Sequence, residues 1–219
     1  MVRLEMVGKR YRTGSGEISA LDGVNLQVPE GAFVVVRGPS GSGKTTLLLA
    51  TGGMLQVSSG SVYVDGEDVY RLNEGQRARL RAENIGFVFQ MFHLLPYLNV
   101  LENVLTPSGA GTGKNARAQA MELLERFGLS ERAFHKPAEL SAGESQRTAI
   151  ARALFTKPRL VLADEPTGNL DPQNAEEVTE YLAEYQRDGG TVLVVTHGAA
   201  ADRYADRIIQ LHDGRIVKM

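Results

Sequence analysis

The sequence contains no cysteine. Without that residue the chain can form neither a disulfide framework nor a thiolate zinc site, and it has no cysteine nucleophile. Long apolar runs are also missing, because stretches such as 160–163 and 192–195 fall far short of the roughly 18 residues that a membrane span needs. The first ten residues carry scattered charges and no apolar run of signal-peptide length. We therefore expect a cytoplasmic protein that does not itself cross a bilayer.

An excess of positive charge is missing as well. Lysine and arginine total 24 against 26 aspartates and glutamates, for a net charge of -2. Proteins that bind nucleic acid usually carry a clear basic surplus. We expect no nucleic-acid partner, although a local basic patch is left open. The chain has 219 residues, of which 42% are hydrophobic and 23% charged, which is typical of one globular α/β domain and too short for two catalytic domains.

Short apolar runs alternate with helical stretches along the chain. Broken alternation through residues 2–36 predicts antiparallel strands, and continuous apolar runs such as 33–36 and 160–163 are typical of strands buried on both faces. Apolar residues spaced by three between 98 and 137 predict a helical insert, and 172–187 predicts a crossover helix. Further strands are predicted at 85–89 and 191–196.

These elements predict an α/β fold with a mostly parallel sheet, an N-terminal antiparallel β subdomain and a helical subdomain. We expect a single domain over residues 1–219. Its core and antiparallel subdomain would take about 1–90 and 158–219, and the helical subdomain about 91–157.

A glycine-rich segment follows the first buried strand. Residues 38–45 read Gly-Pro-Ser-Gly-Ser-Gly-Lys-Thr, which matches the phosphate-loop pattern GxxxxGK[ST] between a predicted strand and a predicted helix. In such a loop backbone N–H groups surround phosphate oxygens, the lysine reaches the β and γ phosphates, and the threonine hydroxyl binds Mg²⁺. The alternative is a merely flexible glycine loop. The predicted phosphate-binding residues are Gly38, Ser40, Gly41, Ser42, Gly43, Lys44, Thr45 and Thr46.

A pair of acidic residues follows a later buried strand. The apolar run 160–163 leads directly into Asp164 and Glu165. An aspartate at this place would hold Mg²⁺ through water, and the glutamate after it would activate the attacking water. Together with the phosphate loop, this pair predicts a nucleotide-hydrolysing enzyme. Kinases and GTPases share both features and remain open at this point.

The segment 140–147 separates these classes. It reads Leu-Ser-Ala-Gly-Glu-Ser-Gln-Arg and resembles the signature motif of the ABC ATPase family, commonly written LSGGQ. Ser141 and Glu144 also form the capping box of a helix start. The two interpretations agree, since a positively polarised helix N-terminus is what a γ-phosphate needs.

Further motifs of the ABC family occur in the family's order. Gln90 follows the predicted strand 85–89, Asn169-Leu170-Asp171 follows the acidic pair, and Thr196-His197 follows the last core strand. Taken singly, Gln90 or His197 would more often be a hydrogen-bonded polar group at a strand end. The resemblance covers essentially the whole chain, from Tyr11 to a predicted strand pair at 208–217.

The sequence departs from the family's pattern at three positions. Ala142 stands for the first signature glycine, and Glu144 replaces glutamine, as in some branches of the family. Gly198 follows His197 where an acidic residue is usual. These differences affect the expected turnover rate and leave the expected chemistry unchanged.

The resemblance implies an ATP-hydrolysing subunit with ATP and Mg²⁺ as cofactors. Two copies would pack head to tail, so that each ATP lies between the phosphate loop of one subunit and the signature of the other. The implied catalytic residues are Glu165, His197, Gln90 and Lys44. The implied metal ligands are Thr45, Gln90 and Asp164. The implied nucleotide contacts outside the phosphate loop are Tyr11 at the adenine, then Ser141, Gly143, Glu144 and Asp171 at the dimer interface.

The stretch 87–104, with 166–171, resembles the branch that contains lipoprotein-release and macrolide-export cassettes, and cell-division cassettes share much of the pattern. That branch implies a homodimer on the cytoplasmic face of the inner membrane, bound to an integral membrane permease. The plain alternative for 87–104 is a packed helical insert.

Two other functional classes remain as alternatives. A soluble ABC ATPase of DNA repair or translation usually has a long coiled coil before the signature or two fused cassettes. Here only 96 residues lie between Lys44 and Ser141. A phosphate-loop kinase would need an acceptor-binding lid and would have no use for a signature motif.

Overall fold

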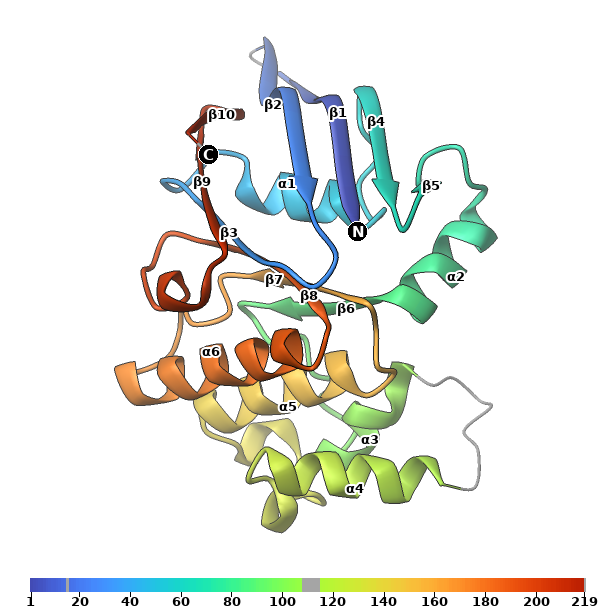
Figure 1. Cartoon of the computed structure of the whole chain (residues 1–219). Helices are drawn as coiled ribbons and strands as arrows, with labels where there is room; N and C mark the ends of the chain where they lie inside the picture. The colour runs from blue at the N-terminus through green and yellow to red at the C-terminus, as the bar shows by residue number, and fades with distance from the viewer. Residues whose placement is uncertain (15, 108–114, 219) are drawn as a thin grey trace.

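Two sheets and a group of helices build the molecule, and the computed structural model describes residues 1–14, 16–107 and 115–218. A four-stranded sheet has the order β2-β1-β4-β5, and a six-stranded sheet has the order β10-β9-β3-β8-β7-β6. Figure 1 shows the four-stranded sheet at one end of the molecule, helix α1 beneath it, and helices α3 to α6 at the other end.

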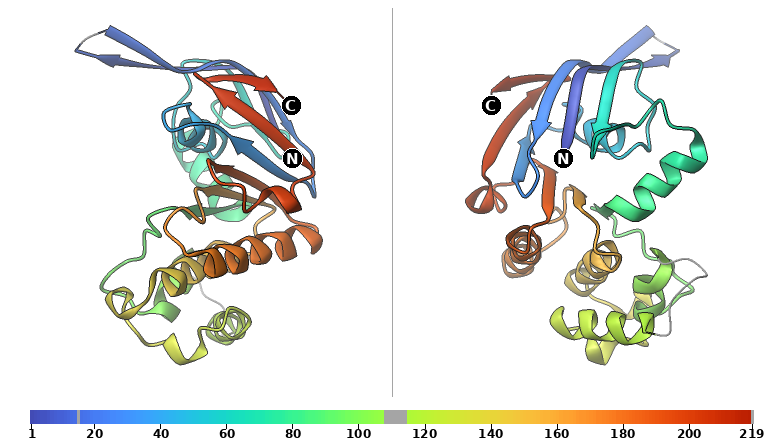
Figure 2. Two further views of the ribbon diagram at one scale, coloured as in Figure 1. Left: turned by 90° about the vertical axis from the view of Figure 1, so that its left-hand side faces the viewer. Right: turned by 45° about the vertical axis from the view of Figure 1, so that its right-hand side comes forward.

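The four-stranded sheet is antiparallel throughout. Its strands are β1 (Val2–Thr13), β2 (Gly16–Val28), β4 (Ser59–Val64) and β5 (Glu67–Asp68). Strands β1 and β2 continue together away from the body of the molecule as a two-stranded hairpin (Figure 2). The antiparallel strands predicted near the N-terminus are therefore confirmed.

The six-stranded sheet is parallel apart from its last strand, β10. Its strands are β3 (Phe33–Arg37), β6 (Ile85–Phe89), β7 (Leu160–Asp164), β8 (Thr191–Thr196), β9 (Arg207–His212) and β10 (Arg215–Lys218). The predicted mostly parallel sheet is confirmed.

The central strands are buried on both faces because apolar residues occupy all of their positions except at the strand ends. In β3, Val34 and Val36 pack into the core shared with α1 (Lys44–Thr51) and the antiparallel sheet. The alternate residues Phe33 and Val35 pack into a second core, shared with the helices on the other face. This double burial fixes the carboxyl end of β3, where the phosphate loop begins.

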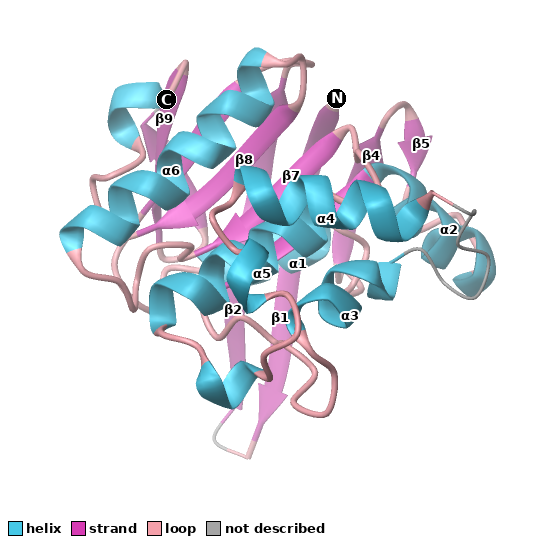
Figure 3. Ribbon diagram, turned by 90° about the horizontal axis from the view of Figure 1, so that it is seen from below, coloured by secondary structure: helices cyan, strands magenta, loops and turns pink. Residues whose placement is uncertain are grey.

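Helices α3 (Val100–Leu105), α4 (Ala116–Arg126), α5 (Ala142–Leu154) and α6 (Pro172–Arg187) form the second core. Seen from below, α5 and α6 cross the face of the parallel sheet, and α3 and α4 lie beside them (Figure 3). The crossover helix predicted at 172–187 is confirmed. The insert predicted between 98 and 137 is helical where it is described, but it breaks into α3, α4 and two short 3₁₀ helices, Ser130–Arg132 and Pro137–Glu139.

Helix α2 (Glu74–Asn84) was not predicted; it has only one buried residue, Leu80. Across the described ranges, no helix combines the length and apolar character that crossing a membrane requires. The proposed boundaries of the helical subdomain, 91–157, stay a prediction. Helix α5 begins in that region and lies against β6 and α6 of the core.

Candidate functional site

The phosphate loop joins the end of β3 to the start of α1. No side chain caps α1, and its N-cap residue Gly43 has φ 101°. A Cβ atom at Gly43 would lie 2.2 Å from the carbonyl oxygen of Ala20, and one at Gly38 would lie 2.2 Å from that of Leu211. Glycine is therefore required at both positions, and the first turn of α1 is left for an anion.

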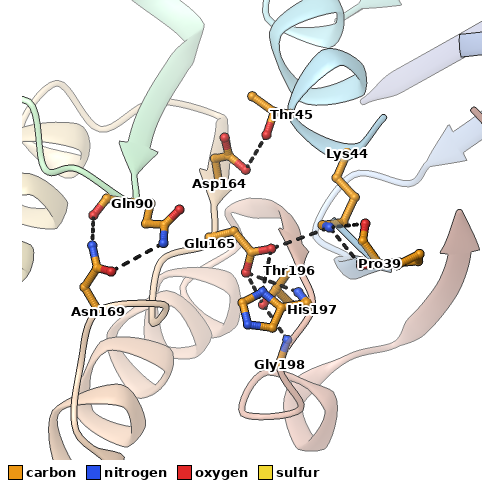
Figure 4. A network of polar contacts seen from close by, with 11 residues as sticks. Pro39, Lys44, Thr45, Gln90, Asp164, Glu165, Asn169, Thr196, His197 and Gly198 are labelled. Atoms are coloured by element: carbon orange, nitrogen blue, oxygen red, sulfur yellow. Dashed lines mark hydrogen bonds and ion pairs between the residues drawn. The ribbon is translucent and has the colours of Figure 1, made fainter. Parts of the chain in front are cut away.

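Lys44 lies inside this loop with only 7% of its surface exposed. Its ammonium donates hydrogen bonds to the carbonyl oxygens of Gly38 at 2.8 Å and Pro39 at 3.0 Å (Figure 4). The same nitrogen lies 3.6 Å from Glu165 Oε1. The carbonyl oxygens of the loop thus hold the ammonium in place, and Glu165, which follows β7, offsets part of its charge.

Asp164 ends strand β7 beside the start of α1. Its Oδ1 accepts a hydrogen bond of 3.1 Å from the hydroxyl of Thr45. Burial raises the pKa of Asp164 above its ordinary value, although the Thr45 hydrogen bond acts in the opposite direction. A cation bound beside this carboxylate would stabilise its ionised form against the effect of burial.

Glu165 lies at the centre of the polar network in Figure 4. Its backbone N–H donates to Val195 O at 2.8 Å, and it holds an unusual positive φ of 45°. Thr196 donates its hydroxyl to Oε2 at 2.8 Å, and the His197 backbone N–H donates to the same oxygen at 3.1 Å. The ring atom His197 Nδ1 lies 2.9 Å from Oε1. Each carboxylate oxygen of Glu165 is therefore oriented by at least one donor.

These donors also determine the charge of Glu165. Burial alone would raise its pKa. The hydrogen bonds from the His197 ring, the Thr196 hydroxyl and the His197 backbone outweigh burial, and the pKa of Glu165 lies below its ordinary value. The carboxylate is therefore ionised at neutral pH and able to accept a proton.

Gln90 follows the end of β6 and pairs with Asn169, separately from the contacts of Glu165 (Figure 4). Its amide donates to Asn169 Oδ1 at 3.4 Å, and Asn169 donates back to the Gln90 carbonyl at 3.1 Å. The residues of the phosphate loop, Gln90 and Glu165 line one pocket of about 550 Å³, whose lining is Ala20, Ser40, Gly41, Gly43, Lys44, Thr45, Thr46, Gln90, Glu165 and His197. The fold thus brings together most of the residues predicted for catalysis and phosphate binding.

The signature segment, residues 140–147, lies outside this pocket at the start of α5. Ser141 caps the helix: its hydroxyl accepts from Glu144 N at 3.2 Å, while Glu144 Oε2 accepts from Ser141 N at 2.7 Å. Ser141 and Ala142 are exposed and Gly143 is buried. The predicted capping box is confirmed, and the helix start faces solvent.

The signature helix contacts the start of α6 through Asn174. A Cβ atom at Gly143 would lie 2.1 Å from Asn174 Oδ1. Asn174 also donates to Asp171 Oδ2 at 2.5 Å and accepts from Arg147 Nη1 at 3.0 Å. Asp171 caps α6 by accepting from the backbone of Gln173 and Asn174. The predicted interface residues Ser141, Gly143, Glu144 and Asp171 therefore form a second group where the starts of α5 and α6 meet.

Tyr11 is the predicted residue that joins neither group. It lies on β1 with 39% of its surface exposed, and Lys9 Nζ lies 5.1 Å from the centre of its ring. Its adenine contact stays a prediction, as do the individual roles of the other site residues.

The sequence motifs included Thr196 and Asn169 but predicted no contact for either, and Asn174 was not predicted at all. Thr196 and Asn169 orient Glu165 and Gln90, and their places beside His197 and in the 169–171 motif were the available signals. Asn174 was missed. The one signal for Asn174 in the sequence was its position three residues after Asp171, which caps α6.

Comparisons with known proteins agree with this geometry. A family model described as ABC transporter matches residues 21–168. The lipoprotein-releasing system ATP-binding protein LolD of Hyphomonas neptunium is 47% identical over 219 residues, covering 98% of this chain and 96% of that protein. The macrolide export ATP-binding/permease protein MacB 1/2 of Paracoccus denitrificans is 44% identical, covering 99% of this chain and 33% of that protein.

Solved structures give the same result. The ATP-binding cassette MJ0796, in a dimeric post-hydrolysis state bound to ADP and Pi, has a TM-score of 0.93 and 43% identity. That similarity covers 100% of this chain and 97% of the other. The phosphate pocket, the separate signature helix and these whole-chain similarities lead to one conclusion: the chain belongs to the ABC transporter family and is one of its ATP-binding subunits.

Proposed function

We propose that this ATPase works as a head-to-tail homodimer that drives a separate membrane permease of the lipoprotein-release or macrolide-export kind. One observation carries the proposal: within one chain, the two parts of the predicted ATP site lie apart. The pocket around Lys44 and Glu165 and the signature segment are separate, and each offers groups suited to phosphate. Two chains in opposite orientation would complete two sites, and the similar MJ0796 cassette is described as dimeric.

The pocket residues fit an ATP·Mg²⁺ complex. Thr45 and Asp164 offer oxygen donors 3.1 Å apart, the ligand type that Mg²⁺ prefers, beside a phosphate-binding loop. Within the part of the chain that the structure describes, no three His, Cys, Asp or Glu side chains form a metal cluster by themselves. This agrees with a metal that is held largely by nucleotide phosphates and water, to which it would supply positive charge. Gln90 is the third proposed ligand, through its side-chain oxygen Oε1, while its amide nitrogen donates to Asn169.

Glu165 is the general base in this proposal. Its ionised carboxylate, oriented by Thr196 and His197, accepts a proton from the water that attacks the γ-phosphate. Lys44 holds the β and γ phosphates, and His197 contacts the γ-phosphate. Ser141 and Gly143 of the opposite chain bind the same phosphate at the N-terminus of α5, where the helix dipole favours negative charge.

The proposed partner follows from the relatives. The LolD relative is named as the ATP-binding protein of a lipoprotein-releasing system, and the MacB relative is named as an ATP-binding and permease protein in one chain. This chain spans 33% of the MacB relative. By similarity to the LolD relative, which is matched over 96% of its length, we propose that the permease is a separate protein and that the ATPase lies on the cytoplasmic face of the membrane that holds it.

Affinity capture tests this proposal. Tagged Glu165→Gln protein would be expressed in its native host, trapped with ATP, solubilised gently and analysed by mass spectrometry. We expect an integral membrane protein with a large extracytoplasmic domain to co-purify in the presence of ATP. Lys44→Ala, which should not bind ATP, is the matched control and should capture less of it. Recovery of ribosomes, DNA or only soluble proteins would instead support the non-transport ABC ATPases.

A further inference from the structure

Glu144 places a negative charge at the start of the signature helix. The family's usual residue at this position is the neutral glutamine, whereas this chain carries a carboxylate. Its Oε2 atom accepts the backbone N–H of Ser141 at 2.7 Å, so the charge lies directly beside a residue proposed to contact the γ-phosphate. A phosphate that approached Ser141 would be repelled by this carboxylate, and a nearby cation would reduce the repulsion.

Arg132 supplies that cation from outside the signature segment. It ends the 3₁₀ helix Ser130–Arg132, and its Nε donates to Glu144 Oε1 at 2.8 Å. The two oxygens of Glu144 are thus divided between the helix start and the guanidinium. The Arg132 side chain is 42% exposed and that of Glu144 19% exposed, so the pair lies at the surface but is partly shielded from water.

Glu144 stays charged under all conditions in which the enzyme would work. The hydrogen bond from the Ser141 backbone and then that from Arg132 lower the pKa of Glu144 to about 2. Protonation therefore cannot remove the charge at neutral pH. Glu131 and Glu139 also interact electrostatically with Arg132, so loss of the guanidinium would leave three neighbouring carboxylates with less compensation. The nearby Lys136 directs its ammonium to the carbonyl oxygen of Tyr97.

We propose that Arg132 is a positioning residue of the signature half-site, which neutralises Glu144 and holds it against Ser141 so that the start of α5 can receive a nucleotide phosphate. The inference rests on the proposed function, because it assumes that α5 of one chain meets the ATP of another. It assigns to Arg132 a role that the family's signature motif does not include, and it explains how a glutamate is accommodated in that motif.

The test is a rescue experiment in the Glu165→Gln background, in which the ATP-bound dimer is expected to accumulate. The ATP concentration that gives half-maximal dimerisation would be measured by analytical ultracentrifugation. We expect Arg132→Ala to raise it by about tenfold, the size of effect typical for a hydrogen bond to a charged group. Once Glu144→Gln has removed the charge, adding Arg132→Ala should change it by less than about twofold.

Arg126→Ala is the matched control. Arg126 also makes ion pairs in the helical region, to Glu184 at 2.9 Å and Asp188 at 3.6 Å, and its side chain is 50% exposed. It lies on α4, away from the signature segment, so its loss should change dimerisation by less than about twofold. Binding of a fluorescent ATP analogue to the single chain should be the same in all variants, since the phosphate loop is untouched. Arg132→Lys, which keeps the charge without the guanidinium geometry, should give an intermediate effect.

The outcomes separate this inference from the proposed function. If the parent protein binds ATP but never dimerises, the proposed function fails and this inference fails with it. If the parent dimerises and Arg132→Ala behaves like Arg126→Ala, only the role of Arg132 is refuted. Equal damage by Arg132→Ala with and without Glu144→Gln would also refute it, because a merely structural arginine gives that pattern. Thermal melts would show whether Arg132→Ala folds. If it does not fold, Arg132→Lys is compared with Arg126→Ala instead, and equal dimerisation of these two variants refutes the role of Arg132.

Discussion

The phosphate pocket and the signature helix are both proposed to bind phosphate, and they are organised by different means. In the pocket, side chains from the phosphate loop, β7 and the end of β8 hold one another, and Lys44 and Asp164 are only 7% and 9% exposed. At the signature helix, Ser141 is exposed and its cap is formed within four residues. The pocket is therefore organised by tertiary contacts and the signature by local capping. This difference is expected if the second surface must stay accessible to a partner.

The pKa values of the carboxylates in the two regions are also shifted in opposite directions. Burial raises the pKa of Asp164, whereas hydrogen bonds from Ser141 and Arg132 lower that of Glu144 to about 2. The pocket thus contains a carboxylate that a cation would stabilise. The signature carboxylate is already compensated by groups of its own chain, which leaves the helix N-terminus able to attract an anion.

Removal of the proposed general base should have the largest effect. Within the pocket it should abolish most ATP hydrolysis without weakening ATP binding. Glu165→Gln keeps the size of the side chain but cannot accept a proton, so we expect ATP hydrolysis to fall by about 10²- to 10⁴-fold. ATP affinity should be retained, and an ATP-bound dimer should accumulate. Steady-state phosphate release and equilibrium ATP binding would measure the two effects. An equal loss of affinity would contradict the assignment of Glu165.

Gly143→Ala should damage the signature region and leave the pocket intact. The added Cβ atom would lie 2.1 Å from Asn174 Oδ1, so the Asn174 side chain must move and give up its hydrogen bonds with Asp171 and Arg147, at a cost of about 1–3 kcal/mol. We expect ATP-dependent dimerisation to weaken by about 5- to 100-fold while single-chain ATP binding is unchanged.

Lys44→Ala should damage the pocket and leave the signature region intact. Loss of the buried ammonium should weaken ATP binding by the single chain, and dimerisation should fail as a consequence. Gel filtration with light scattering and a nucleotide-binding assay would compare the two proteins. If Gly143→Ala reduced single-chain affinity as much as Lys44→Ala, the two regions could not be functionally separate. Unchanged ATP affinity in Lys44→Ala would refute the phosphate-loop assignment.

Features encoded by neighbouring residues could be predicted from the sequence. The phosphate loop, the Ser141 capping box and helix α6 each depend on residues within a few positions of one another. The strands at 33–36 and 160–163 were predictable because burial on both faces requires an unbroken apolar run. Helix α2 was missed because a helix with one buried residue has no apolar period, although the Asn73 and Gln76 capping box marks its start.

Contacts between distant segments could not be predicted in this way. Thr196 orients Glu165 from 31 residues away, and Asn174 approaches Gly143 only because α5 and α6 pack together. The ion pair between Arg132 and Glu144 joins a 3₁₀ helix to the signature, and no local spacing rule indicates it. The sequence thus named most residues of the two groups, while their orientation required the packed structure.

The smallest expected effect concerns the contribution of Glu144 to stability. Its pKa is about 2 in the folded chain against an ordinary 4.5, so its ionised form is stabilised by folding. A group with a depressed folded pKa stabilises the protein above its unfolded pKa, and this contribution is lost as the pH falls through the folded pKa. Glu144→Gln should therefore be less stable than the parent at pH 7, and the difference should shrink between about pH 5 and pH 2. Urea denaturation of both proteins across this range would measure it, and the effect should be modest because the pair lies at the surface, where solvent screens it. A difference that does not vary with pH would mean that the shape of the side chain matters at the signature start and that its charge does not.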